Sequence, residues 1–140
     1  MTSVEMMDRL CKRLINQQPA YIQTHDYPDH DAVGSAFGLR ELLANQGITA
    51  HIIYKGEIQR DSLHEMINKL GIPIEPADNH ALDEKSPIIL VDGCKGNRNV
   101  TDLIGDEIAV IDHHQVSDPD DVPLIVVVKQ FGLNFLRRIA

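Results

Sequence analysis

Cysteine and long apolar runs are both scarce in this chain of 140 residues. The two cysteines, Cys11 and Cys94, are too few and too far apart for a disulfide framework or a cysteine-based zinc site, so a reducing compartment fits. No apolar run approaches the roughly 20 residues of a membrane span, and the N-terminus lacks the pattern of a signal peptide. The sequence therefore predicts a cytoplasmic protein without a membrane partner.

Basic residues are outnumbered, with 13 Lys and Arg against 21 Asp and Glu, which gives a net charge of -8 at pH 7. This balance disfavours sequence-independent nucleic-acid binding through a broad basic face, so a phosphorylated partner needs cations placed locally. Hydrophobic residues make up 43% of the chain, which excludes intrinsic disorder as its main state. The length predicts one domain with a substantial core.

Strands and helices are predicted to alternate along the chain. Apolar residues at helical spacing predict a helix over 3–17, a second helix that Asp31 caps and that ends before Gly47, and a third over 62–70. Short segments rich in β-branched and apolar residues predict strands at 20–23, 49–54, 87–91 and 107–111. This order predicts an α/β fold, a three-layer Rossmann-like domain with a mostly parallel sheet.

Polar side chains gather directly after three of the predicted strands. The string HDYPDHD occupies 25–31, Asp92 follows the strand at 87–91, and Asp112-His113-His114 follows the strand at 107–111. In parallel α/β sheets the functional crevice lies beyond the carboxyl ends of the strands, so these three segments are predicted to form one site. The remaining histidines His51, His64 and His80 are scattered and are interpreted as surface residues.

The chemistry of these side chains favours divalent cations. Carboxylates brought close together repel one another and either take up protons or bind cations. A mixed set of imidazoles and carboxylates suits Mn²⁺ or a related ion, and Asp29 and Asp31 are spaced so that each can reach a different ion while Asp92 bridges. The pattern predicts a two-metal hydrolytic site. The competing interpretation, a solvated turn of Asp and Pro at 25–31, leaves the other two strand ends unexplained.

The strings HDYPDHDAVGSAFGL, VDG and IDHH resemble, in order and approximate spacing, the first three motifs of the DHH phosphoesterase superfamily. That superfamily includes RecJ-like exonucleases and the oligoribonuclease/pAp phosphatases. The resemblance covers about residues 20–115 of this chain, and the fuller form of its first motif is closer to the oligoribonuclease and pAp phosphatase branch.

The resemblance implies a set of five metal ligands: His25, Asp29, Asp31, Asp92 and His113. One Mn²⁺ ion would be held by His25 and Asp29 and the other by Asp31 and His113, with Asp92 bridging the two; Mg²⁺ or another divalent ion is the alternative. The implied catalytic residues are Asp92, His113 and His114.

Four residues are expected to contact the substrate or to support the metal ligands. By the resemblance, His114 would face the substrate phosphate, and Asp112 would orient a neighbouring histidine from behind the metal ligands. Lys95 and Arg98 follow the bridging candidate and can meet a substrate phosphate; the alternative is that they belong to a solvated loop.

The sequence departs from the family pattern after the third motif. We expect residues 1–123 to be a DHH-type domain that is incomplete at its C-terminal end, and residues 124–140 to be a tail that does not match the family. The fourth motif, with a further Asp ligand, and the DHHA1 substrate domain are absent from the sequence. The tail offers an apolar face through which copies of the chain can self-associate, formed by Leu133, Phe135, Leu136 and Ile139.

These features predict a manganese-dependent phosphoesterase domain, related to hydrolases of short oligonucleotides or nucleoside phosphates and impaired as this chain stands. Its expected partner is a phosphorylated small molecule or a short oligonucleotide. The alternative is a non-catalytic module that binds metal, nucleotide or another protein.

Overall fold

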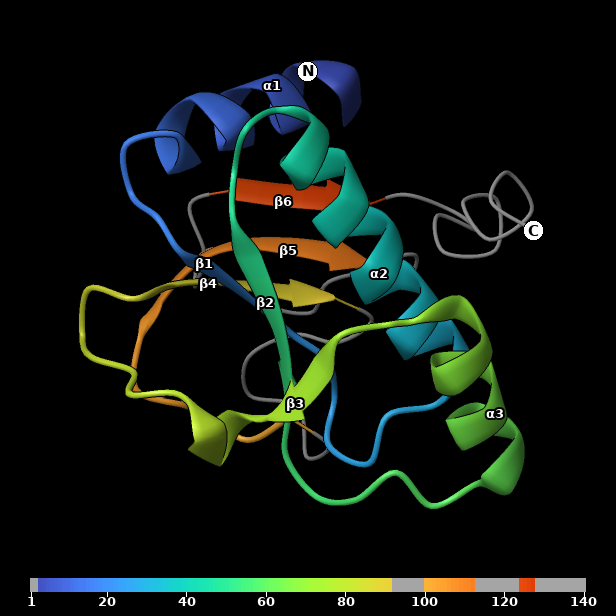
Figure 1. Cartoon of the computed structure of the whole chain (residues 1–140). Coiled ribbons are helices and arrows are strands. Elements are labelled where there is room, and N and C mark those ends of the chain that lie inside the picture. The colour runs from blue at the N-terminus through green and yellow to red at the C-terminus, as the bar shows by residue number, and fades with distance from the viewer. Residues whose placement is uncertain (1–2, 92–99, 113–123, 128–140) are drawn as a thin grey trace.

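The structure is a computed structural model that describes residues 3–91, 100–112 and 124–127 of the chain, with side chains at 4–91 and 100–111 (Figure 1). Its centre is a six-stranded sheet in the order β3-β2-β1-β4-β5-β6, and each strand pair is parallel. The strands are β1 Ala20–Gln23, β2 Ala50–Tyr54, β3 Ile74–Pro76, β4 Pro87–Val91, β5 Asp106–Asp112 and β6 Leu124–Val127. The predicted Rossmann-like α/β fold is confirmed.

Three α-helices contribute to the hydrophobic core on one face of the sheet: α1 Ser3–Leu14, α2 His30–Asn45 and α3 Asp61–Leu70. On the sheet side, Ile22 of β1 lies opposite Ile52 of β2 and Ile89 of β4, so a row of isoleucines crosses the central strands. The helices place their buried leucines in the same cluster: Leu10, Leu14, Leu39, Leu43 and Leu63. This face holds the larger of the two core clusters in the described part of the chain.

The opposite face of the sheet is covered by the 3-10 helix η1 Ala77–Asn79 and by loops. Alternate strand residues point to this side and form a second apolar cluster: Tyr21, Ile53, Ile88, Leu90 and Val110. Ala77 belongs to this cluster, and Leu82, Val100 and Leu103 pack against it. The α-helices, the sheet, and η1 with its neighbouring loops form three layers. Because both faces of the sheet are covered, the central strands have continuous apolar sequences.

The strand order places a topological switch point between β1 and β4. The chain builds β1, β2 and β3 towards one edge, then returns to the centre and builds β4, β5 and β6 towards the other edge (Figure 1). In open parallel sheets ligands bind beyond the carboxyl ends of the strands at such a point. A ligand site is therefore expected where the chain leaves Gln23 of β1 and Val91 of β4.

The end of the first helix and the cap of the second differ from the prediction. The first helix ends at Leu14 rather than at residue 17, because the chain turns there, with Gln17 N–H donating to the Leu14 carbonyl, before it enters β1. The cap of α2 is Asp29 and not Asp31, because Asp29 has an extended backbone and accepts the hydrogen bond from Ala32 N–H. Asp31 lies inside the first turn.

Two strands of the sheet were not predicted from the sequence. β3 has three residues and ends in proline, and β6 lies in the segment that we expected to be a tail. Among the described residues, no helix combines the length and the apolar character that a membrane span needs.

Candidate functional site at the carboxyl ends of the strands

The turn that follows β1 is anchored to the end of β2. Thr24 N–H donates to the Ile53 carbonyl at 3.2 Å, and Tyr27 N–H donates to the Lys55 carbonyl at 3.0 Å. Tyr27 has a φ of 54°, a left-handed conformation that side chains of its size rarely adopt. Its ring lies against Gly56, where an added Cβ would come within 2.9 Å of the ring carbons. The tight turn therefore depends on a glycine opposite Tyr27.

His25 and Asp29 come together across this turn. The Nδ1 atom of His25 lies 2.8 Å from the carbonyl oxygen of Asp26, and because a carbonyl can only accept, Nδ1 carries the proton. The lone pair is then on Nε2, which lies 3.6 Å from Oδ1 of Asp29. The His25 side chain is 13% exposed and that of Asp29 is 54% exposed. A hydrogen bond that fixes the tautomer in this way is typical of histidines that bind metals.

The start of α2 holds two carboxylates. Oδ1 of Asp29 accepts from Ala32 N–H at 2.9 Å, and the Asp29 carbonyl accepts from Val33 N–H at 3.1 Å. Asp31 follows in the first turn and is exposed. The positive end of the helix dipole stabilises both negative charges. Helix capping thus positions Asp29 towards His25, and the helix carries Asp31 beside it.

Asp26, to which the sequence interpretation gave no role, ties this turn to the segment before β5. Its Oδ1 accepts from Thr101 N–H at 3.0 Å, and its Oδ2 accepts from the Thr101 hydroxyl at 2.5 Å. Gln23, which is 1% exposed, donates from Nε2 to the Thr101 carbonyl at 2.8 Å. Thr101 therefore holds the end of β1 and the turn after it. Because Thr101 lies 75 residues after Asp26, no pattern in the sequence around Asp26 could predict this contact.

The three strand ends that we predicted to meet are neighbours in the sheet. Gln23 of β1 lies opposite Leu90 of β4, and Val91 lies opposite Ile111 of β5. The adjacency follows from the central position of β4 between β1 and β5.

Several predicted site residues lie outside the described residues: Asp92, Lys95, Arg98, His113 and His114. Asp112 ends β5, and its backbone alone is described. Of the predicted ligands, the structure places His25, Asp29 and Asp31, and it brings His25 and Asp29 into contact.

A second group of metal-ligand side chains lies elsewhere in the sheet. His51 of β2, Glu75 of β3 and His80 after η1 place their potential ligand atoms within 4.8 Å of one another. The interpretation of His51 and His80 as scattered is therefore wrong, because they lie together; both are half-buried at the surface. They meet because β3 pairs with β2, and β3 is the short strand that the sequence did not predict. His64 is exposed on α3, as expected.

Most of the chain is similar to known proteins. Residues 19–131 match the family described as DHH family, N-terminal domain. The uncharacterized protein MJ1633 of Methanocaldococcus jannaschii is 35% identical over 100 residues, which are 71% of this chain. The chain covers 21% of the length of that relative. The family match includes every predicted site residue and extends over β6.

Proposed function

This chain belongs to the DHH family, because residues 19–131 match the N-terminal domain of that family, and on that premise we propose that it is a manganese-dependent phosphoesterase domain. Its proposed substrates are short oligonucleotides or nucleoside phosphates. The observation that carries the proposal is the pair of His25 and Asp29 at the carboxyl end of β1, beside the switch point of the sheet. The His25 tautomer and the nearby carboxylate match what a divalent ion requires.

The donor set fits a metal ion at this position. The 3.6 Å between His25 Nε2 and Asp29 Oδ1 is close to the roughly 3 Å that separates neighbouring ligand atoms around an octahedral ion with bonds of about 2.1 Å. We propose that His25 and Asp29 hold one ion and that Asp31, with His113, holds a second, with Asp92 between them. When bound, two such ions activate a water molecule and stabilise the charge on phosphoryl oxygens.

The chain's own residues hold this arrangement in place. The Asp26 carbonyl fixes the His25 ring through Nδ1, and Thr101 fixes the Asp26 carboxylate. We propose that His114 contacts the substrate phosphate, that Asp112 orients a neighbouring histidine, and that Lys95 and Arg98 supply local positive charge.

Positive charge placed locally at the site is consistent with the net charge of -8, which disfavours binding of a phosphorylated partner through a broad basic face. The scarcity of cysteine supports a reducing compartment, which we propose is the cytoplasm. The three motifs give the second ion only three proposed ligands: Asp31, Asp92 and His113. With so few ligands the second ion would be held loosely and the substrate phosphate would be poorly positioned. We therefore expect the 140-residue chain to hydrolyse substrates slowly, because positioning of the substrate supplies much of a typical rate enhancement.

Phosphoesterase activity is tested by single-turnover assays with the chain in excess over pAp or a short oligoribonucleotide. We expect slow hydrolysis that requires Mn²⁺ and that falls at least about 100-fold in Asp31→Asn, because one of few metal ligands is lost. Asp61→Asn is the control, since Asp61 also lies in the first turn of a helix, α3. Binding of Mn²⁺ without detectable hydrolysis of either substrate would instead favour a non-catalytic module.

A further inference from the structure

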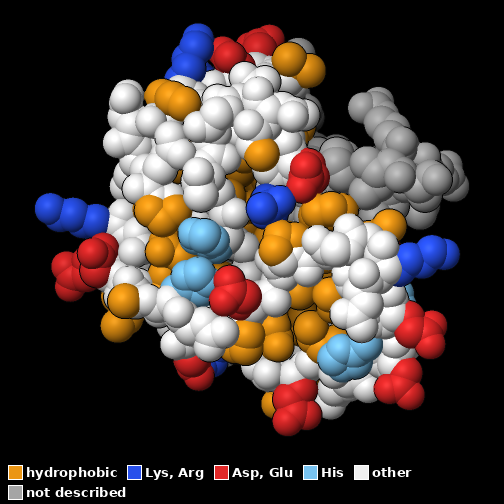
Figure 2. Space-filling view, in the orientation of Figure 1, with side chains coloured by type: hydrophobic (Ala, Val, Ile, Leu, Met, Phe, Trp, Pro, Cys, Tyr) orange, Lys and Arg blue, Asp and Glu red, His pale blue; other side chains and the backbone are white. Residues whose placement is uncertain are grey.

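Two imidazoles and a carboxylate converge on the sheet face opposite the three α-helices. His51 lies on β2 and pairs in register with Tyr21 of β1, while Glu75 of β3 lies opposite Ile53, two residues further along β2. After β3 the chain turns through η1 and returns His80 over the same place, with its ring centroid 4.9 Å from that of His51. Figure 2 shows two adjacent histidine side chains with an acidic side chain beside them on this surface.

His80 has a buried nitrogen that the described residues do not satisfy. Its Nε2 is inaccessible to solvent and has no hydrogen-bond partner, although Oε1 of Glu75 lies 3.4 Å away. Buried polar atoms are nearly always paired, and leaving one unpaired is destabilising. Glu75 is 47% exposed at its side chain and can move, whereas the His80 side chain is 16% exposed. A bound cation would satisfy the His80 nitrogen and the carboxylate together.

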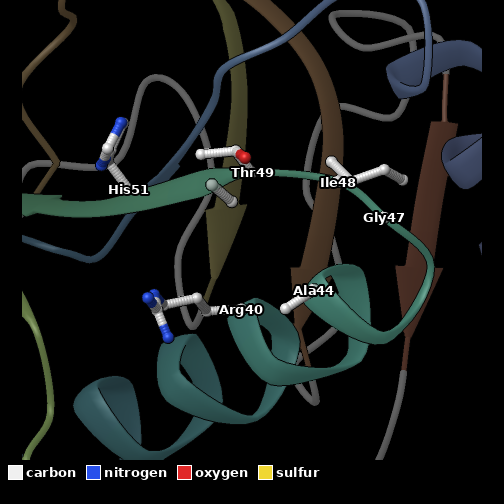
Figure 3. A pocket seen from close by; sticks show the side chains of 7 residues that line it. Arg40, Ala44, Gly47, Ile48, Thr49 and His51 are labelled. Atoms are coloured by element: carbon white, nitrogen blue, oxygen red, sulfur yellow. The ribbon is translucent and has the colours of Figure 1, made fainter.

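The surroundings of His51 favour its neutral imidazole, which is the form that binds metals. Burial lowers the pKa of His51, the neighbouring His80 lowers it further, Glu75 opposes the shift, and Arg40 adds to it. Arg40 is itself paired with Glu41, with 2.8 Å between Nη1 and Oε1. In Figure 3 Arg40 extends from α2, while the His51 ring stands on the side of β2 that faces away from this helix.

Both histidines are reachable from solvent. His51 borders a hollow of about 340 Å³ that Arg40 and Thr49 also line (Figure 3). His80 borders another of about 380 Å³, beside Asp78 and Asp102. Each histidine therefore lies next to a hollow at the surface, although Nε2 of His80 is itself covered.

We propose that His51, Glu75 and His80 form a second metal site of this domain, specific for Zn²⁺ or a similar borderline-soft divalent ion, with water as the fourth ligand. Two imidazoles and one carboxylate are a donor set that zinc accepts in tetrahedral geometry. With bonds of about 2.0 to 2.2 Å, tetrahedral ligand atoms lie roughly 3.4 Å apart, so the present separations of at most 4.8 Å shorten by up to about 1.4 Å on binding. Rotation of the half-exposed Glu75 side chain supplies part of this movement.

This site is distinct from the centre at the carboxyl ends of the strands. It lies on the face of β2 and β3 and shares no residue with the turn at 25–31. Variants of the two sites can therefore be compared in the same chain.

Zinc binding is tested by calorimetry of the 140-residue chain and by the visible spectrum of Co²⁺, which absorbs strongly in tetrahedral sites. The test variants are His51→Gln and Glu75→Gln, and His64→Gln is the control, because His64 is exposed on α3. Asp29→Asn weakens the strand-end centre separately, and circular dichroism checks that each variant is folded.

We expect one tetrahedral site, seen as a Zn²⁺ binding step with a matching tetrahedral Co²⁺ spectrum, in the wild type, in His64→Gln and in Asp29→Asn. His51→Gln and Glu75→Gln should each weaken Zn²⁺ binding about 100-fold or more, because ligand loss costs at least as much as the loss of a residue behind a ligand. Unchanged zinc affinity in both folded variants would overturn the proposal. Loss of zinc binding in Asp29→Asn alone would overturn it as well, because the ion would then belong to the strand ends.

Discussion

Replacing Asp29 by alanine is expected to lower both the stability of the domain and its affinity for Mn²⁺, whereas Asp29→Asn is expected to lower only the affinity. Oδ1 of Asp29 accepts the hydrogen bond from Ala32 N–H at the start of α2. Asparagine keeps that acceptor but loses the negative charge, while alanine loses both. Loss of a helix cap costs about 0.5 to 2 kcal/mol.

Thermal unfolding with and without Mn²⁺ separates the two effects. At about 100 times its dissociation constant, Mn²⁺ should stabilise the wild type by roughly 2.7 kcal/mol, and this gain should largely disappear in both Asp29 variants. Without metal, Asp29→Asn should unfold close to the wild type and Asp29→Ala should unfold earlier. Asp61→Ala is the control, because Asp61 does not cap α3. A full Mn²⁺ gain in Asp29→Asn would show that Asp29 is a cap and not a ligand.

Leu39→Ala is expected to destabilise the domain by about 2 to 5 kcal/mol, because the side chain is fully buried and its removal leaves a cavity. Leu39 lies on α2, the helix that carries Asp31 and that Asp29 caps. A loss of this size is a large fraction of the 5 to 15 kcal/mol that ordinarily stabilises a domain. Urea unfolding measures the change through the midpoint and slope.

Leu42→Ala on the same helix is the matched control for Leu39→Ala. Leu42 is half-buried and lies outside the buried core cluster, so its truncation should cost clearly less. Equal losses in the two variants would contradict the packing of α2 on the sheet.

Local patterns were sufficient for the elements that bury a regular apolar face. β4 has the predicted bounds, 87–91, because five consecutive apolar residues are buried on both sides of the sheet. α3 begins one residue before the predicted start at Ser62 and ends at Leu70, where Gly71 adopts the left-handed conformation that ends the helix. Such features depend on residues that are close in the sequence.

The sequence did not predict features that depend on the backbone conformation at one residue or on how strands pair. Asp29 and Asp31 are equally good caps by residue type, and the extended backbone at Asp29 decides between them. β3 is too short to show a period of its own, and the contact of His51 with His80 exists because β3 and η1 fold back onto β2. The link from Asp26 to Thr101 likewise joins segments with no common pattern.

The location of bound Mn²⁺ is the most direct test of a metal centre at the carboxyl end of β1. Mn²⁺ is paramagnetic and broadens the NMR signals of nearby nuclei, so a titration of the isotope-labelled chain with small amounts of Mn²⁺ maps the site. We expect the signals of residues 25–31 to broaden first, and those around His51, Glu75 and His80 to broaden only at higher concentrations. Broadening that begins around His51 and His80, or that spreads evenly over the chain, would contradict a manganese centre formed by His25, Asp29 and Asp31.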